Sequence, residues 1–201
     1  MLDFYILAQG IALKKIGLTG SIGAGKSTVG KLLRERGFAV LDCDAEVHRL
    51  YACNEKLRKR LASEFGKSVL TADGVSREYL ADIVFKDSEK RSLLESIVYP
   101  YLETSIENFF TSSANEGKAF IEAALLFKVP NTLAKLDEVW NVDASAEVRL
   151  ERLVKRGLNR EDAMRRIELQ KQNPALNHSR IVNIDNSRTE AELQETLKSI
   201  L

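Results

Sequence analysis

The sequence predicts an α/β fold in which a doubly wound, parallel, five-stranded sheet carries an inserted helical lobe and a small lid. Five short apolar runs alternate with helical patterns along the chain, as expected when buried parallel strands are joined by crossover helices. A glycine-rich turn separates the first run from a helical pattern, and 201 residues suffice for one such domain with a sizeable core.

The predicted strands cover residues 15–19, 39–42, 118–123, 138–142 and 181–184. Capping residues indicate where the later helices begin. Ser145 is a candidate N-cap after the fourth strand, and Asn159 opens a further helix. Thr189-x-x-Glu192 forms a capping box before the last helix. These signals support the alternation of strand and helix that a doubly wound sheet requires.

The turn after the first strand carries the most specific motif of the chain. It reads G-S-I-G-A-G-K-S over residues 20–27 and satisfies the phosphate-loop pattern G-x-x-x-x-G-K-[ST]. The glycines let backbone N–H groups converge on phosphate oxygens at a helix N-terminus. The motif therefore predicts a nucleoside triphosphate site on a sheet of the P-loop NTPase type. The predicted binding positions are Gly20, Gly23, Ala24, Gly25, Lys26, Ser27 and Thr28.

Three side chains of this loop have distinct expected roles. Lys26 reaches the β- and γ-phosphates, and the Ser27 hydroxyl is the protein ligand of Mg²⁺. Thr28 adds a further polar contact in the same helical turn. The site therefore needs Mg²⁺ as its cofactor.

Two carboxylates follow the second strand, at the edge where open α/β sheets bind ligands. Strand alternation is expected to aim Asp42 and Asp44 at one side and to pack Cys43 on the other. One carboxylate can accept the proton of an attacking hydroxyl while the other supports Mg²⁺ or its waters. Asp44 could instead cap the following helix. His48 is interpreted as a surface or packing residue.

The stretch between the second and third strands is longer than a crossover needs, about seventy residues. It is predicted to hold several helices, over about 45–65 and 77–113, and to form the inserted lobe. A charged segment that contains Asn159 is interpreted as the lid. The expected organisation is a single domain over 14–201, with an N-terminal extension at 1–13, a core of 14–45, 116–156 and 177–201, a lobe over 46–115 and a lid over 157–176.

Four arginines follow one another at intervals of three or four residues, which would place them on one face of a continuous helix. Gly157 is predicted to end that helix before the last of them. Arg149 is assigned to a solvated basic face. Arg152, Arg156 and Arg160 are singled out because arginines near a lid can stabilise the charge of a transferring phosphoryl group.

The composition favours small molecules as partners. Thirty basic and 29 acidic residues give a net charge of +1, so no bulk field attracts nucleic acid or an anionic membrane. Cys43 and Cys53 are too few for a disulfide framework, and with His48 and His178 they form no metal cluster. The two thiols are expected to be reduced, in the cytoplasm. Residues 1–13 are too short to span a bilayer, and a monomer is expected with oligomers left open.

Taken together, the motifs resemble the dephospho-CoA kinase family from Lys15 to the end of the chain. The phosphate loop is followed, in the family's order, by V-L-D-C-D and by S-R-x-x-L-x-x-I-V-F with Arg77 and Phe85. E-x-x-L-L-F from Glu122 and I-D-N-S from Ile184 complete the series. Each motif is short, but their combination is specific.

This resemblance implies ATP as co-substrate and transfer of its γ-phosphate to the ribose 3′-hydroxyl of dephospho-CoA, the last step of coenzyme A synthesis. It also implies the three parts of such an enzyme, which are a core, a helical CoA lobe and a lid. The family's motifs assign the roles residue by residue. Asp44 is the base beside Asp42 on the substrate side, Arg152 contacts phosphates, Asn186 lies on the adenine side, Arg156 and Arg160 flank the lid, and Arg77 belongs to the acceptor lobe.

Three positions depart from the family's pattern. Tyr99 precedes Pro100 where the family shows His-Pro, and Ala124 and Lys128 replace the proline and the glutamate of P-L-L-F-E. The lysine reverses the charge near the expected acceptor cleft, which puts acceptor affinity in question more than the phosphate site.

A phosphate loop also occurs in other classes of nucleotide-binding protein. A shikimate kinase-like enzyme would carry a Gly-Gly-Gly element and a GTPase would carry N-K-x-D, and the sequence contains neither. Another small-molecule P-loop kinase, or an ATP-binding module without catalysis, remain the alternatives.

Overall fold

The computed structural model describes residues 12–124, 126, 130–170 and 178–201. The chain divides into two compact units. We call residues 1–41 together with 110–201 the core unit, and residues 42–109 the helical unit. Within the described residues, no helix is long and apolar enough to cross a membrane.

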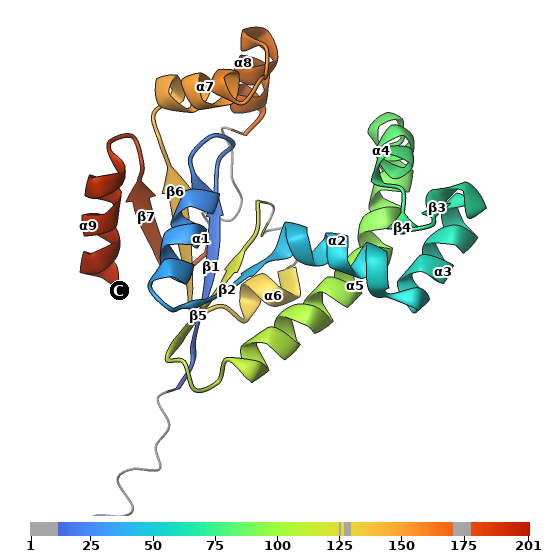
Figure 1. Cartoon of the computed structure of the whole chain (residues 1–201), viewed down its shortest axis with the longest axis horizontal. Helices are drawn as coiled ribbons and strands as arrows, with labels where there is room; N and C mark the ends of the chain where they lie inside the picture. The colour runs from blue at the N-terminus through green and yellow to red at the C-terminus, as the bar shows by residue number, and fades with distance from the viewer. Residues whose placement is uncertain (1–11, 125, 127–129, 171–177) are drawn as a thin grey trace, which may run out of the picture. The chain divides into compact units, whose positions relative to one another are not determined.

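A five-stranded sheet forms the centre of the core unit, with the strand order β2-β5-β1-β6-β7 (Figure 1). The pairs β1–β5, β1–β6 and β6–β7 are parallel. The five predicted strands are confirmed to within one residue at each end. They are β1 (Lys14–Gly20), β2 (Ala39–Asp42), β5 (Lys118–Glu122), β6 (Glu138–Asp143) and β7 (Ile181–Asp185).

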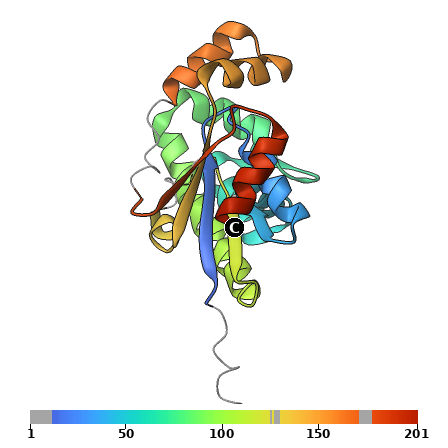
Figure 2. The same ribbon diagram turned by 90° about the vertical axis from the view of Figure 1, so that its left-hand side faces the viewer.

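Helices cover the sheet because successive residues of β1 point to opposite faces. Ile16 and Leu18 pack in one apolar cluster with side chains of α1 (Lys26–Glu35) and α9 (Glu190–Ile200), which lie on the same face (Figure 2). Gly17 faces the other way, where a Cβ would lie 2.6 Å from side-chain atoms of Leu126 and Leu136. A short helix, α6 (Pro130–Ala134), precedes Leu136.

The helical pair α7 (Ala146–Lys155) and α8 (Arg160–Leu169) follows β6 (Figure 1). Their predicted caps are confirmed, because Ser145 accepts the N–H of Val148 at 3.3 Å and Asn159 accepts that of Asp162 at 2.8 Å. Gly157 ends α7 as predicted, with a φ of +94° that favours glycine.

The same agreement holds at the last helix. The capping box of Thr189 and Glu192 is present at the start of α9, as predicted.

The helical unit holds several helices, as predicted, and one hairpin that was not. Its helices are α2 (Cys43–Cys53), α3 (Glu55–Phe65), α4 (Arg77–Lys86) and α5 (Ser88–Ser112), the last of which continues into the core unit, and a 3₁₀ turn spans Lys67–Val69. The hairpin pairs β3 (Leu70–Thr71) with β4 (Gly74–Val75). It lies against α2, because a Cβ on Gly74 would be 2.5 Å from the carbonyl oxygen of Tyr51.

Candidate active site

The phosphate loop joins β1 to α1 in the strand-to-helix context that its motif requires. Gly23 and Gly25 adopt positive φ angles of 78° and 94°, which residues with a Cβ rarely take. The carbonyl of Gly25 accepts the N–H groups of Thr28 and Val29 at 3.0 and 3.2 Å and so starts the helix. Helix α1 therefore begins directly at Lys26, and the N–H groups at its very start, ahead of those two bonds, are the ones that a helix N-terminus offers to an anion.

Two predicted residues hold the outer side of this loop. Arg152 Nη1 donates to the carbonyl oxygens of Gly23 and Ala24 at 3.4 and 3.1 Å. Asn186 Nδ2 donates to the Ala24 carbonyl at 2.7 Å. Because the C=O and N–H of a trans peptide point in opposite directions, the N–H of Gly25 is turned away from these two side chains.

Arg152 and Asn186 also contact each other. Arg152 Nη2 donates to the carbonyl of Asn186 at 2.8 Å, and Asn186 is only 5% exposed. A Cβ on Gly25 would lie 2.2 Å from Asn186 Nδ2, so this packing itself requires glycine. The structure thus brings both predicted residues to the phosphate loop. The expected phosphate contact of Arg152 and adenine contact of Asn186 stay predictions.

The lysine of the loop is paired with a buried carboxylate. Lys26 Nζ lies 2.8 Å from Oε1 of Glu122, whose side chain is 1% exposed. Arg34 approaches Oε2 of the same carboxylate at 3.5 Å. The second oxygen also lies against α1, where a Cβ on Gly30 would be 2.4 Å from it. Two cations therefore compensate one buried negative charge.

Glu122 is a site residue that the sequence reasoning used only as part of a family motif. It ends β5, a strand that is otherwise apolar from Ala119 to Ile121. An acidic residue that closes a buried parallel strand is a usable signal, because such strands are normally apolar throughout. Arg34 carries no comparable signal in the sequence, because it lies on α1 among other charged residues.

The prediction for Arg149 was wrong. Its side chain is only 11% exposed and its guanidinium lies 3.9 Å from Asp143, so it is not part of a solvated face. The cause is the packing of α7 on the phosphate loop, where a Cβ on Gly23 would be 2.9 Å from the Arg149 carbonyl. Arg156, at the end of α7, and Arg160, at the start of α8, are exposed.

The geometry after β2 corrects two expectations. Helix α2 begins at Cys43, and Asp42 caps it, because its Oδ1 accepts the N–H groups of Asp44 and Ala45 at 2.9 and 3.0 Å. Strand alternation therefore does not extend to Asp44, and Asp44 is not the cap. Asp44 is exposed in the first turn of α2, where the helix dipole favours a carboxylate. Cys43 is buried, as expected.

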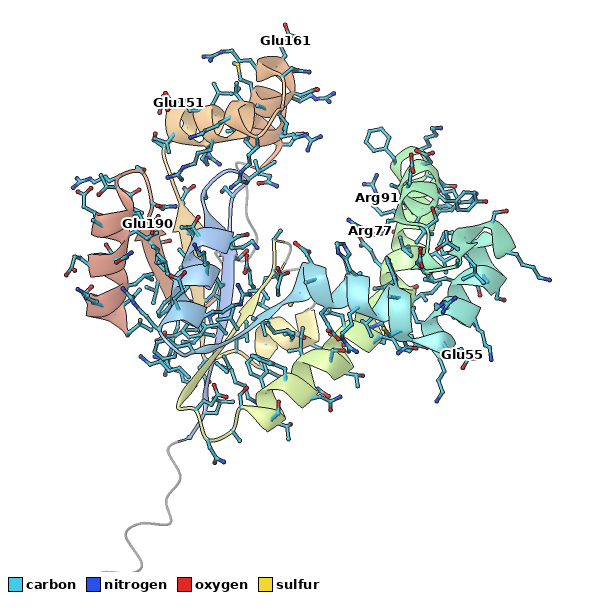
Figure 3. All side chains as sticks on the ribbon, viewed as in Figure 1. Glu55, Arg77, Arg91, Glu151, Glu161 and Glu190 are labelled. Atoms are coloured by element: carbon cyan, nitrogen blue, oxygen red, sulfur yellow. The ribbon has the colours of Figure 1, made fainter. Side chains whose placement is uncertain are left out.

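Asp44 lines a pocket of about 660 Å³ within the helical unit. Arg77, labelled in Figure 3, is the first residue of α4 and lines the pocket too. His48 and Tyr51 of α2 are further lining residues. The apolar part of the wall consists of Val47, Leu80, Ala81, Val84 and Leu94. Burial raises the pKa of Tyr51 to about 12, with the charge of Arg77 opposing it, so Tyr51 keeps its proton as a donor at neutral pH.

The wall of this pocket is braced from α5. Arg91 donates to the carbonyl of Val84 through Nε at 3.3 Å and Nη2 at 3.1 Å, which ties α5 to α4. The combination of a carboxylate, a guanidinium and apolar side chains can hold a ligand that carries phosphate and apolar parts and can present a hydroxyl to Asp44.

The departures from the family pattern fall in different places. Tyr99 is half-buried in α5, and burial followed by the charge and hydrogen bond of Glu95 raises the pKa of its phenol. Ala124 is exposed just after β5. Lys128 lies outside the described residues.

A parallel sheet ordered β2-β5-β1-β6-β7, with a phosphate loop between β1 and α1, defines the class of P-loop nucleotide-binding proteins. Residues 14–192 match the model of the dephospho-CoA kinase family, and the chain belongs to this family. It is 39% identical over 191 residues to the dephospho-CoA kinase of Aquifex aeolicus, with 94% of each chain covered. The dephospho-CoA kinase of Staphylococcus haemolyticus is 36% identical over 197 residues, again with 94% of each covered.

Solved structures agree on the fold. The crystal structure of TT1252 from Thermus thermophilus superposes with a TM-score of 0.74 at 31% identity, covering 94% of this chain and 96% of that one. Dephospho-CoA kinase from Campylobacter jejuni gives 0.68 at 23% identity, covering 94% and 95% of the two chains. A shikimate kinase from Acinetobacter baumannii, solved with shikimate, gives 0.52 at 20% identity with 94% of each chain covered, so it shares the fold alone.

Proposed function

We propose that this protein transfers the γ-phosphate of ATP to the ribose 3′-hydroxyl of dephospho-CoA, which yields coenzyme A and ADP. The observation that carries the proposal is an intact phosphate loop in a chain that matches the dephospho-CoA kinase family over residues 14–192. The phosphate loop indicates a nucleoside triphosphate as the phosphoryl donor. Membership of the family indicates dephospho-CoA as the acceptor.

On the donor side, the loop N–H groups and Lys26 bind the triphosphate, and Lys26 exchanges Glu122 for phosphate oxygens. Ser27 is exposed in the first turn of α1, so its hydroxyl suits a Mg²⁺ that takes its other ligands from phosphates and water. The metal would neutralise charge on the phosphates. Arg152 and Asn186 keep the loop in its binding shape. Asn186 is also assigned to the adenine side of the bound nucleotide, as the family resemblance implies.

On the acceptor side, Asp44 accepts the proton of the attacking hydroxyl, with Asp42 holding the start of α2 beside it. Arg77 supplies a planar cation for a phosphate group of the acceptor. The lobe over 46–115 is assigned to the acceptor on the strength of the family resemblance. Arg156 directly precedes the proposed lid over 157–176 and Arg160 lies near its start, and both are assigned to ATP on the strength of the family resemblance. Residues 171–176 of the lid lie outside the described part of the chain.

A cytoplasmic location and a monomeric state complete the proposal. The location is supported by the low cysteine content, and small-molecule partners are supported by the balanced net charge of +1. No observation in the described residues favours a shikimate kinase-like acceptor or an ATP-binding module without catalysis over the proposed reaction.

Mass spectrometry of dephospho-CoA incubated with ATP and Mg²⁺ tests the reaction directly. One phosphate should be added, on the ribose, and excess chelator should abolish the addition. Shikimate, offered as a control acceptor, should remain unmodified. Release of ADP that does not depend on dephospho-CoA, or phosphorylation of shikimate instead, would contradict the assignment.

A further inference from the structure

One face of helix α2 lines the pocket that contains Asp44. The lining residues of this helix are Asp44, Val47, His48 and Tyr51, a spacing of three or four residues that places them on the same side of a helix. His48 follows Asp44 by one turn, and Cβ atoms at that spacing are about 5–6 Å apart. The imidazole of His48 therefore stands beside the carboxylate that is proposed to accept the proton.

His48 has the features of a ligand-binding side chain rather than those of a packing residue. It is exposed, and its ring takes part in no hydrogen bond or ion pair with any other residue that the structure describes. His178, the other histidine of the chain, differs because its Nδ1 accepts the backbone N–H of Arg180 at 3.1 Å. Both ring nitrogens of His48 can therefore bond to an acceptor molecule, and a neutral imidazole offers it one donor and one acceptor.

The charges in the pocket indicate which part of the acceptor molecule meets His48. Arg77 interacts electrostatically with Tyr51, which is seven residues, or about 10 Å along the helix axis, beyond Asp44. The cation that suits a phosphate is therefore near the far end of this helix face. A phosphate beside His48 would be repelled by the carboxylate of Asp44, whereas a hydroxyl is neutral and both donates and accepts hydrogen bonds.

We propose that His48 binds the hydroxyl next to the one that Asp44 deprotonates, which in dephospho-CoA is the ribose 2′-hydroxyl. The two hydroxyls are on adjacent ring carbons, and the two side chains are one helical turn apart. The contact holds the ribose with its 3′-hydroxyl toward Asp44, and it makes His48 a residue that selects ribose over 2′-deoxyribose acceptors. The inference rests on the proposed transfer to the ribose 3′-hydroxyl.

Steady-state kinetics with dephospho-CoA and with its 2′-deoxyribose analogue test the contact, since both acceptors keep the 3′-hydroxyl. One hydrogen bond between neutral groups shifts an equilibrium by about 2- to 10-fold, so the wild type should have a kcat/KM higher by about that factor for dephospho-CoA. His48→Ala should lower kcat/KM for dephospho-CoA by the same factor and leave the analogue unaffected, so that the preference disappears. His48→Gln keeps a hydrogen-bonding amide and should retain part of the preference.

His178→Ala is the matched control, because it makes the same substitution in the core unit and should keep the ribose preference of the wild type. A wild type that uses both acceptors equally, or a His48→Ala protein that keeps the preference, would overturn the inference. An equal loss for both acceptors would also overturn it, since His48 would then act on a phosphate or on the shape of the pocket. Wild-type protein that phosphorylates neither acceptor would instead overturn the proposed function, and the inference with it.

Discussion

At the scale of single residues, Lys26 has two partners that it cannot serve at once. In the structure it neutralises Glu122, a carboxylate with 1% exposure. When Lys26 turns to a triphosphate, Glu122 would be left as a buried charge, which is costly unless another partner remains. Arg34, at 3.5 Å from the second oxygen, supplies that partner. The three-residue cluster therefore lets the lysine change partners at low cost.

We expect Lys26→Met to abolish transfer and also to destabilise the fold. The loss of stability should be about 3 kcal/mol, at the low end for a broken buried ion pair because Arg34 still faces the carboxylate. Lys26→Met combined with Glu122→Gln should regain most of that stability, since no buried charge is left unpaired, while transfer stays absent. Urea unfolding and an activity assay measure the two effects separately. A double variant that is less stable than Lys26→Met would show that the pair is not coupled in this way.

The roles of Asp42 and Asp44, at the end of β2, should be distinguishable by comparing the asparagine variant of each. Asp44→Asn removes the proposed proton acceptor and should lower kcat by about 10²- to 10⁴-fold with little change in KM for ATP. Asp42→Asn should leave kcat and the KM for ATP nearly unchanged, because asparagine caps a helix as well as aspartate does. Asp42→Ala should cost about 1 kcal/mol of stability through the lost cap. A larger fall in kcat for Asp42→Asn than for Asp44→Asn would exchange the two roles.

Sequence reasoning located the individual site residues better than their contacts. The phosphate loop was recognisable because its pattern encodes backbone geometry within eight consecutive residues. The pairing of Lys26 with Glu122 was not, because the two are 96 residues apart and meet only when β5 pairs with β1. The burial of Arg149 was missed because spacing tells which residues share a helix face but not what covers that face.

At the scale of elements, α7 serves as the support of the phosphate loop. Its arginines contact the loop by different means, Arg149 through its main chain and Arg152 through its guanidinium. The helix is held in turn by its Ser145 cap and by the glycine turn at Gly157, where the N–H of Leu158 bonds to the carbonyl of Leu153 at 3.2 Å. Arg152, which its place near the predicted lid and the family resemblance mark as a phosphate ligand, thus also supports the phosphate loop.

Arg152→Ala should weaken ATP binding and lower kcat together, because the carbonyls of Gly23, Ala24 and Asn186 lose their common donor. Arg152→Lys should restore little, since an ammonium cannot span three acceptors as a planar guanidinium does. Lys155→Ala, an exposed change on the same helix, is the control and should leave both constants unchanged. Titration with ATP and steady-state kinetics provide the measurements. A fall in kcat with an unchanged Kd for ATP would indicate that Arg152 acts only on the transferring phosphate.

Helices and strands were predictable where they are long enough to show an apolar pattern or begin at a recognisable capping residue. The five strands of the sheet are apolar runs, and the caps of α7, α8 and α9 use side chains with a direct hydrogen-bonding role. The β3–β4 hairpin has strands of two residues each, which is too short for any alternation to appear. Helix α2 begins at Cys43, two residues before the predicted start at about residue 45. The strand and the helix share a boundary here, because Asp42 both ends β2 and caps α2.

At the scale of the whole molecule, the chain separates its candidate sites between its two units. The phosphate loop with Lys26, Glu122, Arg152 and Asn186 belongs to the core unit, and the pocket of Asp44 belongs to the helical unit. The strand order accounts for the first grouping, because β5 and β6 flank β1 and bring their carboxyl ends to the loop that follows it. The helical unit is inserted directly after β2.

This separation predicts that the two substrates protect different parts of the backbone from hydrogen exchange. A ligand stabilises the segments that it binds, so a non-hydrolysable ATP analogue should slow exchange in residues 20–29. Dephospho-CoA should slow exchange in α2 and α4, whose residues line the pocket. Arg77→Ala should reduce the second effect and leave the first intact, because Arg77 lines the pocket and lies in the helical unit. If dephospho-CoA protects only the core unit, the pocket of Asp44 is not the acceptor site, and the proton acceptor has to be sought among the core residues.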